Sequence, residues 1–319
     1  MVPTLRVSVL MPMRNAAPFV SKALRSIINE QQVPLEVVVV DDRSTDGSRA
    51  AVASLEDPRI RVIDGEGRGI SAALNKALWQ SRGDIVMRCD ADDAYPAERI
   101  TTQLSWLDSH PEFGATCGAF VAMDPRGRTK VPLRMAPVAS EITDELRNGL
   151  VRTHFCTYAI RSAVLKEIGG ARSFFATAED IDMQLRLGEV CRVWYSPAIL
   201  YHYRIHDASI THSVRSSDKQ YYDALALRLQ QQRREKGLDD LQRGQLPDGP
   251  GQSGTIVDSA AAHLQSLLIG DMWTAFDNRQ PAKALKAGVR AVVSRPTSIN
   301  GWRQLFIAAS KLMLAKMRL

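Results

Sequence analysis

The sequence has no long apolar run. None of its stretches approaches the roughly 18 to 20 uninterrupted apolar residues that a helix needs to span a bilayer. The N-terminal segment also lacks the charged start, the apolar run and the small-residue cleavage site of a signal peptide. We therefore expect the chain to stay in the cytoplasm.

Cysteine is scarce as well. The four cysteines stand far apart and form no CxxC pair: Cys89, Cys117, Cys156 and Cys191. This spacing fits neither a zinc site nor a disulfide framework. We expect the four thiols to be reduced and mostly buried.

Two binding fingerprints are missing. No GxGxxG motif follows the first strand-like segment, where a nicotinamide dehydrogenase would carry it. Gly65, Gly67 and Gly69 alternate after the third such segment, which is the wrong spacing and the wrong place. No recognisable DNA- or RNA-binding motif is present either. These absences argue against a dehydrogenase and against a nucleic-acid partner.

Acidic residues are absent after Asp277. Nine of the 41 basic residues follow it: Arg279, Lys283, Lys286, Arg290, Arg295, Arg303, Lys311, Lys316 and Arg318. This leaves 32 basic against 35 acidic residues in the rest of the chain, which is therefore slightly acidic although the whole carries a net charge of +6. The basic excess is a local feature of the C-terminal segment.

The rest of the composition is that of an ordinary globular protein. A chain of 319 residues with 45% hydrophobic content supports one large domain, or one domain with an appendage. Its first half alternates β-rich and helix-periodic segments, which is typical of a parallel sheet covered by helices. The expected strands are residues 6–11, 35–40, 60–63 and 84–88. The expected helices are residues 17–29, a helix capped by Ser44 or Thr45, and residues 70–81.

Polar residues follow the ends of these strands. Pro12, Arg14 and Asn15 come after the first strand, and the Asp41-Asp42 pair ends the second. Ligands of open α/β sheets bind at the edge where parallel strands end, because loops and helix N-termini meet there. We therefore expect a ligand at this edge, although Asp-Asp before a Ser-Thr-Asp-Gly run is also ordinary turn and cap chemistry.

The pattern is looser beyond residue 95. We expect helices near residues 97–109, 161–168 and 179–187, and a strand at 115–123. Residues 243–254 combine glycine and proline with few apolar residues, which indicates a flexible linker. The predicted organisation is a catalytic domain at 1–240, a linker at 241–255 and a basic helical region at 256–319.

An acidic segment follows the fourth strand. Asp90, Asp92 and Asp93 place their carboxylates within four residues, and such crowding of like charge calls for a cation or strong donors. Mg²⁺ or Mn²⁺ suits this set, because these ions take one or two carboxylates and complete their shell with phosphate oxygens and water. The alternative is a solvated acidic turn, or a cap of the next helix by Asp92 or Asp93.

Together these residues resemble glycosyltransferase family 2. The resemblance covers residues 7 to about 213 and includes the runs SVLMPMRNA, VVVVDDRSTDGS, GRGISAALNKAL, GDIVMRCDADDAYPAERI, AEDIDMQLRL and YHYRIHDASIT. It implies the GT-A fold, an α/β architecture whose Rossmann-like, mostly parallel sheet is flanked by helices, here with a helical C-terminal appendage. The nucleotide-binding half would cover about 1–95 and the acceptor-binding half about 96–215. The similar branch extends surface polysaccharides or lipopolysaccharide.

The resemblance also implies residue roles. Those expected to bind the nucleotide are Pro12, Arg14, Asn15, Asp42, Arg68, Asn75, Asp90 and Arg204. Those expected to hold a divalent metal are Asp90, Asp92 and His206, with Asp92 the main ligand and Asp93 left open. A lone histidine such as His206 is more often structural.

The Glu179-Asp180 pair opens a predicted helix. The resemblance implies that Asp180 is the catalytic base, and Glu179 beside it is expected to be a second catalytic residue. A positioned carboxylate can take the proton of an acceptor hydroxyl as that hydroxyl attacks the anomeric carbon. The alternative makes both residues ordinary first-turn acids favoured by the helix dipole. His154 is equally well explained by packing in the core, and Arg186 by an i,i+4 pair with Asp182.

The C-terminal segment predicts two basic amphipathic helices. In residues 281–294 the apolar face would hold Ala282, Leu285, Val289 and Val292, and in residues 302–318 it would include Trp302 and Phe306. Such helices suit an anionic membrane surface, where lipid-linked acceptors reside. Alternatively, the apolar faces pack on the catalytic domain or on a second copy in a homo-oligomer.

The prediction is therefore an inverting glycosyltransferase. It would use a UDP-linked sugar and Mn²⁺ or Mg²⁺, act on a glycan or lipid-linked acceptor, and bind the inner face of the plasma membrane through residues 281–319. The alternative is a family member that binds a sugar nucleotide or glycan without turnover. Retention of the residue types at Asp92, Asp180 and His206 argues against it, because a protein that only binds need not keep a base.

Overall fold

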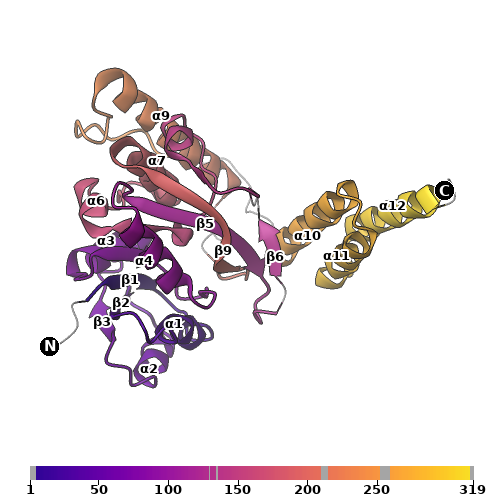
Figure 1. The fold of residues 1–319 in the computed structure, drawn as a ribbon, viewed down its shortest axis with the longest axis horizontal. Coiled ribbons are helices and arrows are strands. Elements are labelled where there is room, and N and C mark those ends of the chain that lie inside the picture. Colours follow the sequence, from indigo (N-terminus) through magenta and orange to yellow (C-terminus); the bar gives the residue numbers. More distant parts are fainter. Residues whose placement is uncertain (1–4, 129, 134–135, 210–214, 252–258, 317–319) are drawn as a thin grey trace. The chain divides into compact units, whose positions relative to one another are not determined.

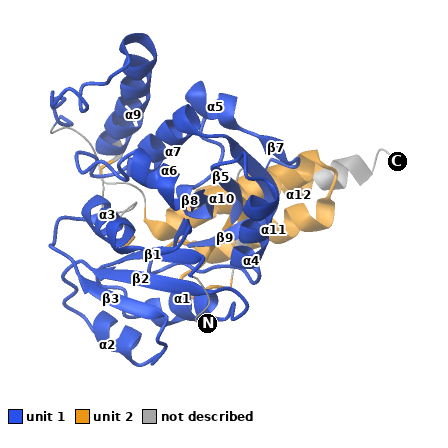
Figure 2. Ribbon diagram, turned by 60° about the vertical axis from the view of Figure 1, so that its left-hand side comes forward, with its two compact units in different colours: residues 1–120, 134–203, 217–254 blue, residues 121–133, 204–216, 255–319 orange. Residues whose placement is uncertain are grey.

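The structure is a computed structural model that describes residues 5–128, 130–133, 136–209, 215–251 and 259–316. These residues form two compact units (Figure 2). The first unit comprises the described residues within 1–120, 134–203 and 217–254, and the second those within 121–133, 204–216 and 255–319. The linker expected at 241–255 falls partly outside the described residues, and Arg318 lies outside them as well.

The N-terminal half of the sheet is parallel (Figure 1). Its order is β3-β2-β1-β4, formed by β1 (Val7–Met13), β2 (Leu35–Asp41), β3 (Ile60–Asp64) and β4 (Ile85–Arg88). The register pairs Met13 with Asp41 and Leu10 with Arg88, so the carboxyl ends of these strands meet at one edge. The polar residues that follow the strands are thereby gathered, as the sequence predicts.

The sheet continues with antiparallel strands. Within the described residues it has nine strands in the order β3-β2-β1-β4-β8-β5-β9-β7, and β6 pairs with β5. The added strands are β5 (Ala115–Met123), β6 (Lys130–Leu133), β7 (Ser140–Glu141), β8 (Ala159–Arg161) and β9 (Val193–Arg204). β8 runs antiparallel to both β4 and β5.

Helices cover both faces of this sheet. Alternate residues of β1 point to opposite sides, so that Val9 and Met11 enter one core and Leu10 the other. Beside Val9 lie α1 (Val20–Ile28), α2 (Ser48–Ala53) and α4 (Arg99–Ser109). Beside Leu10 lie α3 (Ile70–Gln80), α5 (Thr143–Arg147), α6 (Ser162–Glu167) and α7 (Glu179–Val190). This three-layer arrangement confirms the predicted α/β fold.

Two local expectations need revision. α2 begins at Ser48, and the predicted cap by Ser44 or Thr45 is wrong because both residues bond to Asn15 instead. No element was expected at α9 (Ser216–Lys236), yet this helix packs on α7 through Tyr222, Leu225 and Leu229. The many polar residues of α9 leave only a narrow apolar stripe for this contact, which is why the sequence pattern did not predict the helix.

The second unit contains α10 (Ala260–Asp277), α11 (Pro281–Ser294) and α12 (Ile299–Lys316), which confirms the helical C-terminal region. The apolar face predicted for residues 281–294 only partly coincides with the buried face, because Val292 is buried and Leu285 and Val289 are not. α11 buries Ala284, Ala287, Gly288, Ala291 and Val292, whereas Leu285 and Val289 are 38% and 51% exposed.

Small side chains explain this choice of face on α11. A Cβ atom on Gly288 would lie 2.7 Å from a methyl carbon of Leu305 and 2.8 Å from the sulfur of Met272. Small residues let helices approach closely, so this face packs inward and the larger apolar residues remain outside. None of the helices in the described part of the chain combines the length and the apolar content that a membrane span requires.

Candidate active site

The loops after β2 and β3 are joined by Asp42, which is 4% exposed. Its carboxylate accepts hydrogen bonds from the backbone N–H groups of Gly67 at 2.7 Å and Gly69 at 2.9 Å. A Cβ atom on Gly65 would lie 2.7 Å from the Cα atom of Asp42, so glycine is needed for this close approach. Asp42 therefore fixes the glycine-rich loop at the carboxyl edge.

Asn15 joins the neighbouring loops. Its N–H donates to Ser44 Oγ at 3.0 Å, and its Oδ1 accepts from the N–H of Thr45 at 2.8 Å. Asn15 and Arg43 both adopt positive φ, 52° and 62°, a conformation that costs free energy and is often found at functional sites. The exposed Arg14 precedes Asn15. Pro12 lies beyond the last β1–β4 pair, so its missing N–H interrupts none of that ladder.

The other predicted nucleotide residues of this unit have visible partners. Arg68, whose side chain is 70% exposed, pairs with Glu66 at 2.5 Å. Asn75 donates to the carbonyl oxygen of Ala171 at 2.7 Å, and its Oδ1 accepts from the Ala171 N–H at 2.8 Å. Asn75 thus anchors the turn after α6, and its contact with a nucleotide stays a prediction.

Asp90 is already neutralised. The Nε and Nη2 atoms of Arg88 donate to its two carboxylate oxygens at 2.7 and 3.1 Å. The Nη1 atom of the same guanidinium donates to Glu179 Oε1 at 3.1 Å. Arg88 is 5% exposed. The acidic segment after β4 and the start of α7 are therefore joined by one side chain, which the sequence analysis did not select.

Asp93 has a structural partner. The hydroxyl of Tyr201 donates to its Oδ2 at 2.6 Å and accepts from the Asp90 N–H at 3.1 Å. Burial raises the pKa of Tyr201 well above its ordinary value, so the phenol keeps the proton that it donates. Asp93 is 1% exposed. Asp92 is partly exposed, and neither residue caps α4, whose N-cap is Glu98.

The helix α7 begins at Glu179 and Asp180. Its N-cap, Ala178, has φ 62° and no polar side chain that would cap the first turn. Glu179 is buried, and burial raises its pKa to about 7 against the opposing charge of Arg88. The side chain of Asp180 is 21% exposed. Of the two carboxylates, Asp180 is the more exposed to solvent.

His154 faces Asp180. Its Nε2 atom lies 3.9 Å from Asp180 Oδ2, and its Nδ1 accepts the N–H of Cys156 at 3.2 Å. Burial lowers the pKa of His154, so the ring is neutral near pH 7 and its proton sits on Nε2, toward Asp180. The ring also stacks on Tyr201, with centroids 6.0 Å apart. Sequence reasoning left this histidine undecided, because a lone histidine has no local signature.

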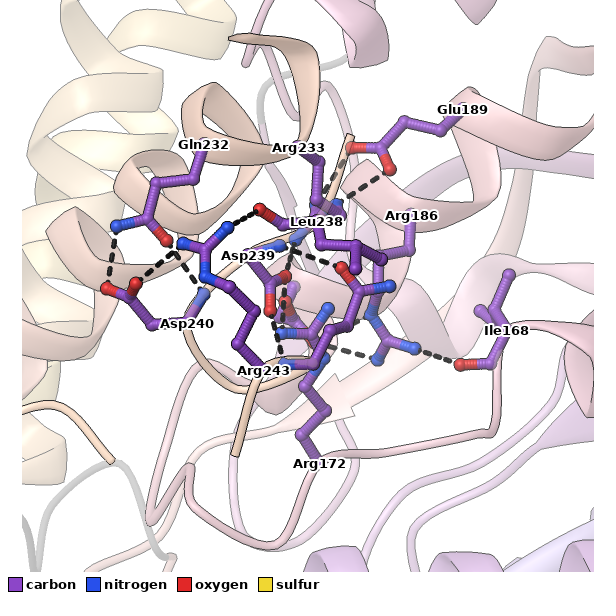
Figure 3. A network of polar contacts seen from close by, with 12 residues as sticks. Ile168, Arg172, Arg186, Glu189, Gln232, Arg233, Leu238, Asp239, Asp240 and Arg243 are labelled. Carbon is purple, nitrogen blue, oxygen red and sulfur yellow. Dashed lines mark hydrogen bonds and ion pairs between the residues drawn. The ribbon is translucent and has the colours of Figure 1, made fainter. Parts of the chain in front are cut away.

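The far half of α7 is held by ion pairs with α9 and the turn after α6 (Figure 3). Arg186 donates to Asp182 Oδ2 at 2.9 Å, which confirms the predicted i,i+4 pair, and to the Gly170 carbonyl at 2.7 Å. Arg172, in the turn after α6, pairs with Asp182 of α7 at 3.4 Å and with Asp239, which follows α9, at 2.7 Å. Arg233 of α9 pairs with Glu189 of α7 at 2.8 Å. The helix that carries Asp180 is therefore fixed along its length.

The remaining predicted residues belong to the second unit. Arg204 is 3% exposed and donates to the Pro125 carbonyl oxygen at 3.0 Å. His206 is partly buried. The positions of both residues are described only with respect to the rest of the second unit. The contact of Arg204 with a phosphate and that of His206 with the metal therefore stay predictions. In the described part of the chain, no group of three or more histidine, cysteine or acidic residues gathers in a way that would hold a metal ion.

Known proteins share this architecture. TarS of S. aureus, residues 1–349 in complex with UDP-GlcNAc, has a TM-score of 0.61 and 19% identity over 91% of this chain and 81% of that one. The mannosyltransferase PcManGT of Pyrobaculum calidifontis, in complex with GDP-Man and Mn²⁺, has a TM-score of 0.52 and 22% identity over 98% and 81%. These likenesses confirm the predicted GT-A fold.

Sequence comparison agrees with the fold. The putative teichuronic acid biosynthesis glycosyltransferase TuaG of Bacillus subtilis is 30% identical over 149 residues, which are 46% of this chain and 58% of that protein. The chain thus spans little more than half the length of this relative. The model of the family described as "Glycosyl transferase family 2" matches residues 8–169, half of the chain. The chain therefore belongs to glycosyltransferase family 2 and is a glycosyltransferase.

Proposed function

We propose that this enzyme transfers a sugar, with inversion, from a UDP-linked donor to a hydroxyl group of a glycan or lipid-linked acceptor. The setting would be the synthesis of a cell-surface polysaccharide or lipopolysaccharide. The observation that carries this proposal is the contact of Arg88 with both Asp90 and Glu179, at 2.7 and 3.1 Å. It brings the acidic segment and the Asp180 end of α7 to one place on the carboxyl edge of the sheet.

Asp180 is the proposed catalytic base. A hydroxyl group must lose its proton as it attacks the anomeric carbon, and an accessible carboxylate within hydrogen-bond reach can accept it. Asp180 is 21% exposed, whereas the Glu179 carboxylate is buried and bonded to Arg88. Attack from the face opposite the departing diphosphate inverts the anomeric centre. In this proposal Glu179 holds Asp180 in position through its contact with Arg88 and takes no proton from the acceptor.

The nucleotide is proposed to bind along the loops after β1, β2 and β3. Asp42 holds the loop at 65–69 through backbone N–H groups, and Asn15 holds the adjoining loop at 44–45. These contacts make the edge rigid before a donor arrives, which lowers the entropic cost of binding. TarS was solved with UDP-GlcNAc and PcManGT with GDP-Man, so both bases belong in a test of the donor.

Mn²⁺ or Mg²⁺ is the proposed cofactor, held chiefly by Asp92. The carboxylates of Asp90 and Asp92 are hard oxygen ligands of the kind these ions take, and such sites rely on substrate phosphates for the remaining positions. The donor atoms of Asp90 and Asp92 are therefore of the kind that suits the ion, although Asp90 already pairs with Arg88 and the described residues gather no third ligand there. The bound ion would neutralise charge that develops on the departing diphosphate. His206 remains a proposed further ligand.

The helices α11 and α12 are proposed to bind an anionic membrane surface. Leu285, Val289 and Val293 recur every four residues on α11 and are 38%, 51% and 69% exposed. On α12, Trp302 and Phe306 are 56% and 73% exposed. Both helices carry basic residues and no acidic ones. Exposed apolar rows beside cationic side chains are complementary to anionic lipids, near which a lipid-linked acceptor would lie.

A donor screen tests the proposed reaction. Thermal unfolding is measured with UDP-glucose, UDP-GlcNAc, GDP-mannose and a dTDP-sugar, each with Mn²⁺ and with EDTA. We expect one UDP-sugar to stabilise the protein only with the metal, and UDP release from it with water or added saccharides as acceptor. Stabilisation without any release, under all acceptors including membrane extracts, would instead support a family member that only binds. Activity that survives EDTA would contradict the proposed dependence on Mn²⁺ or Mg²⁺.

A further inference from the structure

We propose that Arg88 is a positioning residue that fixes the catalytic base to the acidic segment. The inference deepens the proposed function and rests on Asp180 being the base. Arg88 ends β4, and its planar guanidinium engages Asp90, two residues further on, and Glu179, which lies 91 residues from Arg88 in the chain. Its Nε and Nη2 atoms hold both carboxylate oxygens of Asp90, and its Nη1 atom holds Glu179, at distances of 2.7 to 3.1 Å.

The chemistry of the Arg88 side chain suits its contacts with Asp90 and Glu179, which together are called the joint. A guanidinium presents its N–H donors in a rigid fork, so it can bind a carboxylate in a bidentate manner and a second acceptor at a fixed angle. A lysine ammonium is a point charge on a flexible stem and cannot reproduce that geometry. Arg88 and Glu179 are only 5% and 8% exposed, so their contact is screened little by solvent.

The start of α7 depends on such a contact. Helices usually begin with a residue whose side chain accepts a backbone N–H, but Ala178 has no acceptor and adopts φ 62°, which is unfavourable for alanine. The Arg88–Glu179 contact therefore supplies an anchor that the cap does not. Asp180 is the next residue along the helix, so the contact that fixes Glu179 also fixes the orientation of the Asp180 carboxylate.

The joint also separates the tasks of the two acidic residues after β4. Asp90 is occupied by Arg88, whereas Asp92 is partly exposed and remains the main candidate for the metal. Because Asp90 and Glu179 share one cation, movement of the acidic segment on donor binding would be transmitted to the base. The base would then be aligned by the same contacts that hold the donor's end of the site.

The test is Arg88→Lys, measured with the UDP-sugar that passes the donor screen. We expect kcat for UDP release to fall about 10- to 100-fold, because a shift of about 1 Å in a reacting group has this scale. The KM of the donor should stay within about threefold of wild type if the loss lies in alignment. Hydrogen exchange at residues 178–185 should become faster, because the first turn of α7 loses its anchor.

Arg161→Lys is the matched control. Arg161 also donates several hydrogen bonds, but to the carbonyl oxygens of Phe113, Leu107 and His110. It pairs with Ile85, at the opposite end of β4 from Arg88. We expect Arg161→Lys to lower the unfolding temperature as much as Arg88→Lys does and to leave kcat near the wild-type value.

A double-mutant cycle shows whether Arg88 acts through Asp180. If it does, Arg88→Lys should cost less than about threefold once Asp180 is already Asn, because the aligned group is gone. An equal cost in both backgrounds, or a wild-type kcat in Arg88→Lys, would overturn the inference while Asp180→Asn still lowers turnover. A wild-type turnover in Asp180→Asn would instead remove the proposed base, and the positioning role with it.

A second pair of variants covers the case in which Arg88→Lys does not fold. Glu179→Ala breaks the joint from the helix side and leaves Asp90 to neutralise Arg88. Glu179→Gln retains an oxygen that accepts the Nη1 hydrogen bond. We expect the alanine variant to lose kcat as Arg88→Lys would, and the glutamine variant to lose clearly less. Equal losses in both would mean that the carboxylate charge matters and the joint does not.

Discussion

The two units of this protein use charge differently. In the first unit, several charged side chains are largely buried and paired across long sequence separations, as in the contacts of Arg233 with Glu189 and of Arg172 with Asp239. In the second unit, the charged residues of α11 and α12 are all basic, and Lys283 and Lys286 are exposed. Paired buried charges fix geometry inside a unit, whereas exposed charges of one sign act on what lies outside it. Variants in each unit test that division.

The largest effect is expected at Asp180. Asp180→Asn keeps the size of the side chain and removes its basicity, so transfer should fall on the order of 10² or more. Donor binding should remain, because the proposed nucleotide loops are unchanged. Steady-state UDP release and thermal stabilisation by the donor measure the two properties separately. Unchanged turnover would remove Asp180 from the mechanism.

A large loss of stability is expected at Asp182. This residue is 0% exposed and contacts Arg186 at 2.7 Å and Arg172 at 3.4 Å. Asp182→Ala leaves buried cations short of a partner, which typically costs about 3 to 5 kcal/mol. The exposed Lys286→Ala is the control, with a change within about 0.5 kcal/mol. Urea unfolding measures both, and equal costs would show that the two units do not differ in this respect.

An intermediate effect is expected at two basic residues of α11, the exposed Lys286 and the partly exposed Arg290. Lys286→Gln with Arg290→Gln should weaken binding to vesicles of phosphatidylcholine with phosphatidylglycerol by about 2 kcal/mol, on the order of 30-fold. Binding to phosphatidylcholine alone should be weak for wild type and variant. Co-sedimentation at low and high salt provides the measurement.

A second pair of variants tests the apolar row of α12. Trp302→Ser should reduce vesicle binding, whereas Trp79→Ser, which alters a 58% exposed tryptophan of the first unit, should not. If both variants bind as wild type does and binding is the same for neutral vesicles, the membrane proposal is wrong. The apolar row would then be available to a second copy of the chain, which light scattering would detect as a dimer.

The smallest effect concerns pH. Burial raises the pKa of Glu179 to about 7 from an ordinary value near 4.5. Between these values the folded protein keeps the proton that the unfolded chain has released, so this group's contribution to stability falls as pH rises from 4.5 to 7. Glu179→Gln does not titrate. Its unfolding temperature, relative to wild type, should therefore increase across this window by on the order of a few °C and then level off.

Local patterns were sufficient for much of the fold. The strands at 35–41 and 115–123 and the helices at 70–80 and 281–294 follow from runs and periodicities that lie within each segment. The points on which the structure differs from these expectations depend on contacts between segments that lie far apart in the chain. The cap at Ser44 or Thr45 was lost to Asn15, some 30 residues away, and the buried face of α11 was set by what fits against Met272 and Leu305.

The site shows the same division. The sequence alone determined which residue types stand at the ends of the parallel strands and at the start of α7, because these depend on chain order and local period. Only the tertiary structure decided their partners: Tyr201 for Asp93, Arg88 for Asp90 and Glu179, and His154 for Asp180. Such contacts join residues that are mostly dozens of positions apart, and no local period encodes which of several charged groups will meet when the sheet is assembled.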